Sequence, residues 1–444
     1  MRPRSSSRRS RHPPCRDVAE PRPLLLLDGA TGTELARRGF DTRGDAWSAP
    51  AIWREPALLT AIHEEHARAG ADVITANTFR TQRRTLSRIG EGRRAREWTL
   101  EAVRIALEAA RRVTDERGEG STVRVAGSVA PLEDSFSPDV APDETTALAE
   151  HREHVGNLVD GGVDLLLVES MTTIGESRAA TLAAAETGLE TWSAISTDGS
   201  GRRVLSSEPL EAWGEALAPL RPAALLVNCV APDVADAAAR EVVRLADAIG
   251  ALPGAYANLG SAEPLQRGGF DIAMTPEQYA EAMKPLLDAG IRIVGGCCGT
   301  TPDHIRALRT LLDERRAIEA ETREAADPGW RALVRSAAER AGGGRALLIG
   351  DGAPAEALGR YQVTQPAAAE LASLPADRFR LAIIDDGEGA LDGAVRLLEP
   401  GGWLVMRVHG DVESGAQKLR LAGLEVRELT AEGMNVLVLA RRPV

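Results

Sequence analysis

The chain has 444 residues, which is more than one hydrophobic core usually accommodates, so we expect at least two domains. A formal net charge of -12 at pH 7 excludes the global basic field that gathers nucleic acid or an anionic membrane surface. Four cysteines are too few for a disulfide framework, and no apolar run approaches the roughly 20 residues of a membrane span. We therefore expect a cytoplasmic protein that acts on small molecules.

The first 22 residues are basic, and no apolar segment of the length that a secretory signal requires follows them. We interpret residues 1–22 as a disordered tail or an over-called translation start. The next residues already belong to an apolar run that leads into a motif.

From Pro23 onward, short apolar runs alternate with longer amphipathic stretches, most of which end at a glycine. The runs predict eight strands, at 24–28, 72–77, 123–128, 163–170, 191–196, 224–229, 254–259 and 291–297. Eight strand-then-helix units in unbroken succession predict a (β/α)8 (TIM) barrel over residues 23–315. A doubly wound sheet is the alternative, but it rarely needs eight such units.

The rest of the chain predicts a second, smaller α/β domain. Residues 316–345 are charged and helical in pattern, and we interpret them as a helical linker. Residues 346–444 repeat the α/β rhythm in "RALLIGDG", "RLAIIDDGEG", "LLEPGGWLVMRV", "LEVREL" and "NVLVLARR". This pattern predicts a Rossmann-like domain.

Three of the four cysteines lie at predicted strand ends. Cys229 ends the sixth strand, and the adjacent Cys297 and Cys298 follow the eighth, so even-numbered strands aim three sulfurs at one place. Flanking glycines allow the backbone turn that lets neighbouring side chains converge. Three thiolates with an open fourth position suit catalytic Zn²⁺. Cys229 alone would be read as a small buried hydrophobe, but the set of three favours zinc.

Polar residues end other strands at the same predicted face. Asp28 ends the first strand, Asn77 and Thr78 the second, and Glu169 the fourth. Asp28 and Glu169 could hold an ammonium group, while backbone amides near Gly29 could hold a carboxylate. The alternative for both acids is helix capping or loop hydrogen bonding. With a zinc ion, these groups describe a pocket for an amino acid that bears a thiol.

Two pairs of histidines do not add to this site. "HEEH" (63–66) and "HREH" (151–154) space their histidines at i,i+3, whereas the zinc-protease motif needs i,i+4. We interpret both as solvated or core-edge faces of helices.

The motif-bearing strands resemble one family in order over residues 23–315. The segments are "LLLLDGATGTELARRG", "WSAP", "AGADVITANTFRT", "GGVDLLLVES", "LLVNCVAP" and "IRIVGGCCGTTPDHIRAL". They resemble the homocysteine S-methyltransferases, zinc-dependent barrels that make methionine from L-homocysteine and a methyl donor. The resemblance implies that Cys229, Cys297 and Cys298 bind zinc and that Asp28 and Glu169 hold the amino end of homocysteine. It also places Trp47 and Ser48 at the junction of donor and acceptor.

The resemblance favours a sulfonium donor, S-methylmethionine or S-adenosylmethionine. Arg80 follows "NTF" where betaine-using members bind their donor with a tyrosine, and an arginine would repel a quaternary ammonium. One alternative is the homocysteine-activating subunit of a split cobalamin-dependent methionine synthase, although the cobalamin signature Asp-x-His-x-x-Gly is missing. Another is a zinc-stabilised binding protein without turnover.

The C-terminal segment "LLEPGGWLVMRV" resembles class I S-adenosylmethionine-dependent methyltransferases. However, "LLIGDGAPAEAL" departs from the glycine-rich loop that would hold a nucleoside. We therefore expect this domain to be degenerate and non-catalytic.

Overall fold

The computed structural model describes residues 22–118, 121–259, 274–326, 328–349, 361–364, 376–384, 391–409, 422–432 and 435–443, with Leu371, Leu374 and Leu419. The predicted N-terminal tail lies outside these residues, apart from Arg22. The described chain divides into a barrel unit, up to Arg316, and a C-terminal unit from Ala317 to Val444.

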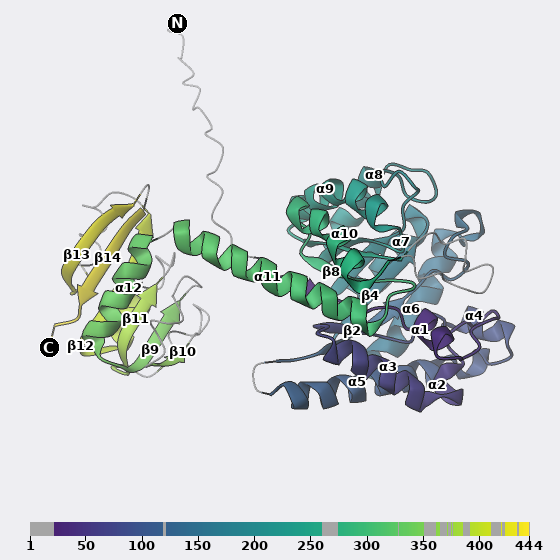
Figure 1. Ribbon diagram of the computed structural model, residues 1–444, viewed down its shortest axis with the longest axis horizontal. Helices are drawn as coiled ribbons and strands as arrows, with labels where there is room; N and C mark the ends of the chain where they lie inside the picture. The colour runs from purple at the N-terminus through teal and green to yellow at the C-terminus, as the bar shows by residue number, and fades with distance from the viewer. Residues whose placement is uncertain are drawn as a thin grey trace, which may run out of the picture. The chain divides into compact units, whose positions relative to one another are not determined.

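Eight parallel strands form the sheet of the barrel unit, which confirms the predicted (β/α)8 fold (Figure 1). They are β1 (Leu25–Leu26), β2 (Val73–Ala76), β3 (Arg124–Val129), β4 (Leu165–Met171), β5 (Thr191–Ile195), β6 (Ala224–Asn228), β7 (Leu252–Ala257) and β8 (Ile293–Gly296). Neighbours in the sheet are neighbours in sequence, β1 pairs with β8, and a bridge from Leu27 to Val73 closes the ring. Every predicted strand is present.

Helices cover the outside of this ring. They are α1 (Gly32–Arg37), α2 (Ala51–Arg54), α3 (Pro56–Arg68), α4 (Arg83–Arg88), α5 (Ala95–Arg117), α6 (Glu144–Gly161), α7 (Ile174–Ala185), α8 (Leu210–Leu217), α9 (Pro232–Ile249), α10 (Pro276–Ala289) and the part of α11 (Pro302–Ala326) up to Arg316. Their ends follow the expected chemistry. The Asp143 side chain caps α6, and Gly162 and Gly290 end α6 and α10 at φ values of 86° and 107°.

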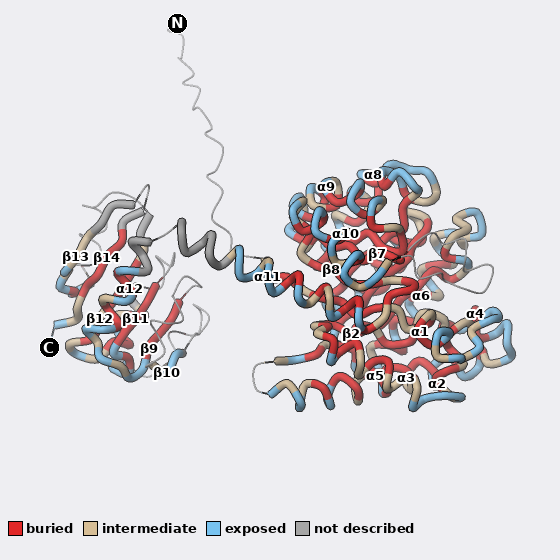
Figure 2. The backbone as a smooth tube through the Cα atoms, viewed as in Figure 1, coloured by how far each residue is buried: buried red, intermediate tan, exposed pale blue. Residues whose placement is uncertain are grey.

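Two apolar layers hold the barrel together. An inner cluster, which includes Trp192, Leu226 and Ile293, fills the ring, and a larger cluster packs the outer faces of the strands against the helices. Buried residues accordingly dominate the strands in Figure 2. The two histidine pairs belong to this interior: His63, His66, His151 and His154 are all buried, so of the two interpretations, solvated or core-edge faces, the solvated one is wrong.

The C-terminal unit contains a six-stranded sheet in the order β10-β9-β11-β12-β14-β13. The strands are β9 (Gly344–Ile349), β10 (Tyr361–Thr364), β11 (Phe379–Ile384), β12 (Leu398–His409), β13 (Glu425–Glu432) and β14 (Asn435–Arg441), with α14 (Leu391–Leu397) before β12. The first four are parallel, and β14 runs antiparallel to β12 and β13. A reversal of strand order between β9 and β11 is the arrangement of a doubly wound sheet.

Helix α12 (Pro328–Ala341) departs from the predicted linker. Its buried residues Leu333, Val334 and Ala337 form one cluster with residues of β9, β11, β12 and β14. The helix thus covers one face of the second sheet, and the linker predicted over 316–345 is too long at its C-terminal end. The segments that follow β9 and β11, where a doubly wound fold binds ligands, lie outside the described residues. No described helix is long and apolar enough to cross a membrane.

Candidate metal centre

Three thiols converge at the carboxyl ends of β6 and β8. The sulfur atoms of Cys229, Cys297 and Cys298 all lie within 4.8 Å of one another. Tetrahedral zinc, with Zn–S bonds of about 2.3 Å, sets neighbouring sulfurs about 3.8 Å apart, so small side-chain rotations would let all three bind one ion. The predicted cluster is present, and its donor set suits a soft or borderline metal ion.

The backbone around the thiols explains why the sequence is rich in glycine there. A Cβ on Gly296 would lie 2.3 Å from the Thr300 hydroxyl oxygen, and one on Gly295 would lie 2.6 Å from Leu27 Cβ. Only Gly299 uses the left-handed region, at φ 87°. Close packing therefore requires the first two glycines, and the turn that we expected rests on Gly299 alone.

The three thiols are hydrogen-bonded to one another, and a bound cation could take the place of the protons in these hydrogen bonds. Hydrogen bonds from the thiols of Cys229 and Cys297 lower the pKa of Cys298. The pKa of Cys229 is raised, first by its hydrogen bonds to the other two thiols and then by burial. One thiolate thus forms readily beside two protonated neighbours, and a divalent cation would favour the loss of the remaining protons.

The thiols open into a cavity of about 1120 Å³ at the carboxyl end of the barrel. Asp28, at the end of β1, lies on its wall and accepts hydrogen bonds from the Thr75 N–H at 2.7 Å and from the Thr75 hydroxyl at 2.9 Å. Burial outweighs these hydrogen bonds and raises the pKa of Asp28 to about 8. The carboxyl is therefore poised to gain from a cation in the cavity.

Glu169 faces the same cavity from β4. It accepts a short hydrogen bond from the Ser128 hydroxyl and one of 3.2 Å from the Tyr256 hydroxyl. Burial raises its pKa to about 7. Tyr256, on β7 between β6 and β8, is a cavity residue that sequence reasoning missed. A lone tyrosine among the small residues of "GAYANL" was the available signal.

The predicted polar residues after β2 occupy different places. Asn77 lies on the cavity wall, but its carbonyl accepts from the Ser48 hydroxyl at 2.7 Å and its amide donates to the Ser48 carbonyl at 3.0 Å. The Thr78 hydroxyl donates to the Ser128 carbonyl at 3.0 Å and accepts from the Ser128 N–H. Neither Ser48 nor Thr78 lines the cavity, so both position the wall rather than contact its contents.

Aromatic rings form the outer part of the cavity. Trp47 packs edge-on against Phe79 at 5.6 Å between ring centroids, and a Cβ on Gly32 would lie 2.2 Å from the Trp47 ring. Gly29 is equally constrained, because a Cβ there would lie 2.7 Å from the His66 ring. Residues 29–33, which lead from β1 into the first turn of α1, can therefore line the cavity in this arrangement only with glycines at these two positions.

Arg80 does not project freely toward the cavity. Its guanidinium lies 4.9 Å from the centroid of the Phe79 ring and donates to the carbonyls of Pro131 and Glu133 at 3.0 and 2.9 Å. Burial lowers its pKa to about 10, so the group is still cationic at neutral pH.

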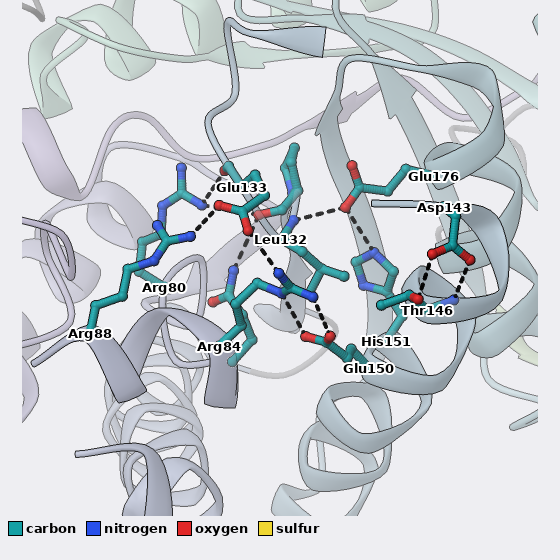
Figure 3. A network of polar contacts seen from close by, with 12 residues as sticks. Arg80, Arg84, Arg88, Leu132, Glu133, Asp143, Thr146, Glu150, His151 and Glu176 are labelled. Atoms are coloured by element: carbon teal, nitrogen blue, oxygen red, sulfur yellow. Dashed lines mark hydrogen bonds and ion pairs between the residues drawn. The ribbon is translucent and has the colours of Figure 1, made fainter. Parts of the chain in front are cut away.

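Ion pairs and hydrogen bonds hold the loop after β3 in place. This loop carries the cavity residues Asp134 and Phe136. Figure 3 shows Arg84 and Arg88 directed at the Glu133 carboxylate, with Arg84 also paired to Glu150. On the other side, buried Glu176 accepts from the Leu132 N–H at 2.8 Å and contacts His151 at 3.3 Å. The outer wall is thus tied to α4, α6 and α7.

Three strained residues also surround the cavity. Among the described residues other than glycine, six have φ in the left-handed region, and Trp47, Ser170 and Cys229 of these lie on the cavity wall. Each such conformation costs on the order of 1–3 kcal/mol and persists only where neighbouring structure enforces it. A barrel with strained strand ends, buried carboxyls and a cluster of three thiols in one cavity has the features of a barrel enzyme with a candidate metal site.

Comparison with known proteins specifies that class. The homocysteine S-methyltransferase family model matches residues 25–312. Homocysteine S-methyltransferase of Escherichia coli K12 is 30% identical over 318 residues, which cover 68% of this chain and 99% of that protein. The crystal structure of the Escherichia coli homocysteine methyltransferase MmuM in its metallated form is 28% identical, with a TM-score of 0.56, and covers 65% of this chain and 96% of MmuM. The oxidized form of MmuM gives 29% identity and a TM-score of 0.55 over 65% of this chain and 95% of MmuM.

The chain therefore belongs to the homocysteine S-methyltransferase family and is a methyltransferase enzyme. The match ends near residue 312, so the C-terminal unit is additional to the part that defines the family.

Proposed function

We propose that this protein transfers a methyl group from a sulfonium donor to the sulfur of L-homocysteine, with zinc as its metal, and so forms methionine. The observation that carries the proposal is the presence of two complementary sets of groups in one cavity. Three thiols within 4.8 Å lie at one wall, and the buried carboxyls of Asp28 and Glu169 line the same space. An amino acid with a thiol and an ammonium group matches both sets.

The donor set fits zinc. Cys229, Cys297 and Cys298 would hold the ion and leave one position of a tetrahedron for a substrate sulfur. Bound there, zinc would lower the pKa of the substrate thiol, which is otherwise about 8.5, and so supply it as a thiolate at neutral pH. All three ligands are anionic, so the bound sulfur would keep the electron density that attack on a methyl group requires.

Asp28 and Glu169 would bind the substrate ammonium. Their raised pKa values mean that burial disfavours ionisation in the free enzyme. An ammonium in the cavity supplies the missing counter-charge, which lowers both pKa values and favours the ionised pair. Tyr256 and Ser128 would hold the Glu169 carboxylate in place through their hydroxyl groups.

The substrate carboxylate would lie near Gly29, in the segment that connects β1 to α1. Not every amide of that loop is available, because the Ala30 N–H donates to the Thr300 hydroxyl at 3.1 Å. Gly29 remains a proposed contact, since it lines the cavity and carries no side chain that would keep a ligand away.

The outer cavity supports a sulfonium donor. Trp47, Phe79 and Phe136 provide aromatic surface, which attracts cations. Arg80 keeps a positive charge next to Phe79, which disfavours a quaternary ammonium at that ring. At about 1120 Å³ the cavity has room for homocysteine with either S-methylmethionine or S-adenosylmethionine.

A donor panel tests the proposal. Purified protein loaded with zinc is incubated with L-homocysteine and, in separate reactions, S-methylmethionine, S-adenosylmethionine, betaine or methylcobalamin, and methionine is measured. We expect methionine with a sulfonium and none with betaine. Activity with methylcobalamin alone would replace this proposal by the split cobalamin system, and binding of homocysteine without turnover in any reaction would favour a non-catalytic protein.

A further inference from the structure

Asn228, the last residue of β6, lies next to two strained residues, Ser170 at the end of β4 and Cys229 directly after β6. Ser170 follows Glu169 and has φ 57°, and Cys229 follows Asn228 and also has φ 57°. Ser170 directly follows the proposed ammonium contact Glu169, and Cys229 is itself a proposed metal ligand. Neither is a glycine, so something other than intrinsic preference keeps both backbones in the left-handed region.

The pairing of β4 with β5 is irregular at this point. Val168 is opposite Ser193, but the next partners are Met171 and Ile195, so three steps on β4 correspond to two on β5. The extra residue forms a β-bulge that contains Glu169 and Ser170. Leu165 and Leu167 belong to the inner cluster, so the alternation of the strand already directs Glu169 to the cavity. The bulge changes the backbone that follows Glu169, at Ser170, and so fixes the place where the strand ends.

Asn228 holds this bulge from a strand that is not its neighbour, because β5 lies between β4 and β6. Its side-chain carbonyl accepts from the Ser170 N–H at 3.1 Å, and its amide donates to the Ser170 hydroxyl at 2.9 Å. Its main-chain carbonyl accepts from the Ser196 hydroxyl at 3.3 Å, after the end of β5. Asn228 is completely buried, and it therefore connects three consecutive strand ends in the interior.

We propose that Asn228 is a positioning residue that sets the distance between the thiol cluster and Glu169. This inference rests on the proposed function, in which those two groups bind the sulfur and the ammonium of one homocysteine molecule. The side chain of Asn228 fixes the backbone at Ser170, directly after Glu169, and its main chain leads directly into Cys229. A carboxamide suits the task because it offers a donor and an acceptor in one plane without placing a charge in the interior.

The test is direct titration of zinc-loaded protein with L-homocysteine in the absence of a donor, followed by steady-state kinetics. We expect Asn228→Ala to raise the Kd and the KM for homocysteine at least tenfold, about 1.4 kcal/mol of binding free energy. Bound zinc should stay at one ion per chain, and the KM for the donor should stay within about twofold, since neither contact depends on the bulge. Ser170→Ala removes one of the two hydrogen bonds and should give a smaller rise.

Two further variants separate positioning from general stability. Ser193→Ala is the matched control, because it removes a buried hydrogen bond of 2.9 Å to Thr181 without reaching the cavity. It should lower the unfolding temperature and leave the Kd for homocysteine unchanged. Asn228→Asp can accept from both groups of Ser170, so its Kd should lie between those of the wild type and Asn228→Ala.

The outcomes distinguish this inference from the function beneath it. Wild-type Kd and KM for homocysteine in Asn228→Ala would overturn the inference and leave the proposed function standing. If that variant does not fold, an unchanged Kd in Ser170→Ala has the same meaning. Failure of the wild-type zinc protein to bind homocysteine at all would overturn both.

Discussion

The two ends of the barrel strands are built on different principles. At the carboxyl end lie the thiol cluster, two carboxyls with raised pKa values and three strained backbones. At the amino end, aspartates simply complete the backbone hydrogen bonding. Asp72 accepts from the Leu26 N–H at 2.8 Å, and Asp164 accepts from the Val125 N–H at 2.7 Å.

This contrast shows how one fold separates function from stability. Polar groups at the amino end are satisfied by the protein itself, whereas those at the carboxyl end are placed so that a ligand or an ion completes them. Substitutions at the two ends should therefore have different signatures, one in binding and turnover and the other in unfolding.

The largest effect is expected at the thiol cluster. Cys298→Ala removes one of three metal ligands, and we expect zinc content to fall well below one ion per chain and methionine formation to drop at least about 1,000-fold. Metal analysis and the methionine assay on the same preparation measure both. Cys15→Ala is the control: Cys15 is the fourth cysteine of the sequence and lies in the segment outside the described residues, and we expect its variant to keep zinc and activity. Full activity in Cys298→Ala would contradict the metal assignment.

A smaller but specific effect is expected from Glu169→Gln. Loss of one charged hydrogen bond to the substrate ammonium should cost about 1.5–3 kcal/mol, a fall of roughly 10- to 150-fold in kcat/KM for homocysteine. Glu176→Gln makes the same substitution at a buried glutamate outside the cavity and should leave the KM for homocysteine unchanged. Equal KM changes in the two variants would argue against a substrate contact at Glu169.

At the opposite end, Asp72→Ala should act on stability. The variant loses the hydrogen bond to Leu26 and the ion pair with Arg309, whose nitrogen lies 3.3 Å away. Because Asp72 is partly exposed, we expect a loss of about 1–2 kcal/mol in unfolding free energy. Thermal unfolding would measure this loss of stability, while the KM for homocysteine should not change. A raised KM would break the separation between the two ends.

A last effect, similar in size to that of Asp72→Ala, concerns pH and a residue of neither end. His63 is completely buried, and burial lowers its pKa to about 3, against about 6.5 when unfolded. Between these values the unfolded chain binds the proton, so stability falls as pH drops below about 6.5, by up to about 1.4 kcal/mol per pH unit. Between pH 7 and pH 5, the unfolding temperature of His63→Leu should fall less than that of the wild type. Identical losses would show that His63 does not contribute.

Much of the fold could be predicted from the sequence because the hydrophobic pattern of each strand and helix is local. Each barrel strand is a short apolar run before a polar or glycine residue, and each long helix has one apolar face. The strand Tyr361–Thr364 was not predicted, because four residues at a sheet edge carry too little pattern. Helix α12 was assigned to a linker because Pro328-Gly329 before it and the glycines 342–344 after it read as linker punctuation, and because few large apolar side chains, Leu333 and Val334 among them, mark the face that packs on the sheet.

What the sequence by itself determined is the set of reactive groups and the end of the barrel at which they lie. Parallel strands in sequence order must bring Asp28, Glu169 and the three cysteines to one rim, whatever the details of packing. The tertiary structure decided which groups are available there. Ser48 and Thr78 make internal hydrogen bonds, and Arg80 donates to main-chain carbonyls. Tyr256 and Asn228 instead hydrogen-bond to residues of the cavity wall. These hydrogen-bond partners lie 29 to 87 residues apart, so their pairing depends on the three-dimensional arrangement of the strands, which local sequence does not encode.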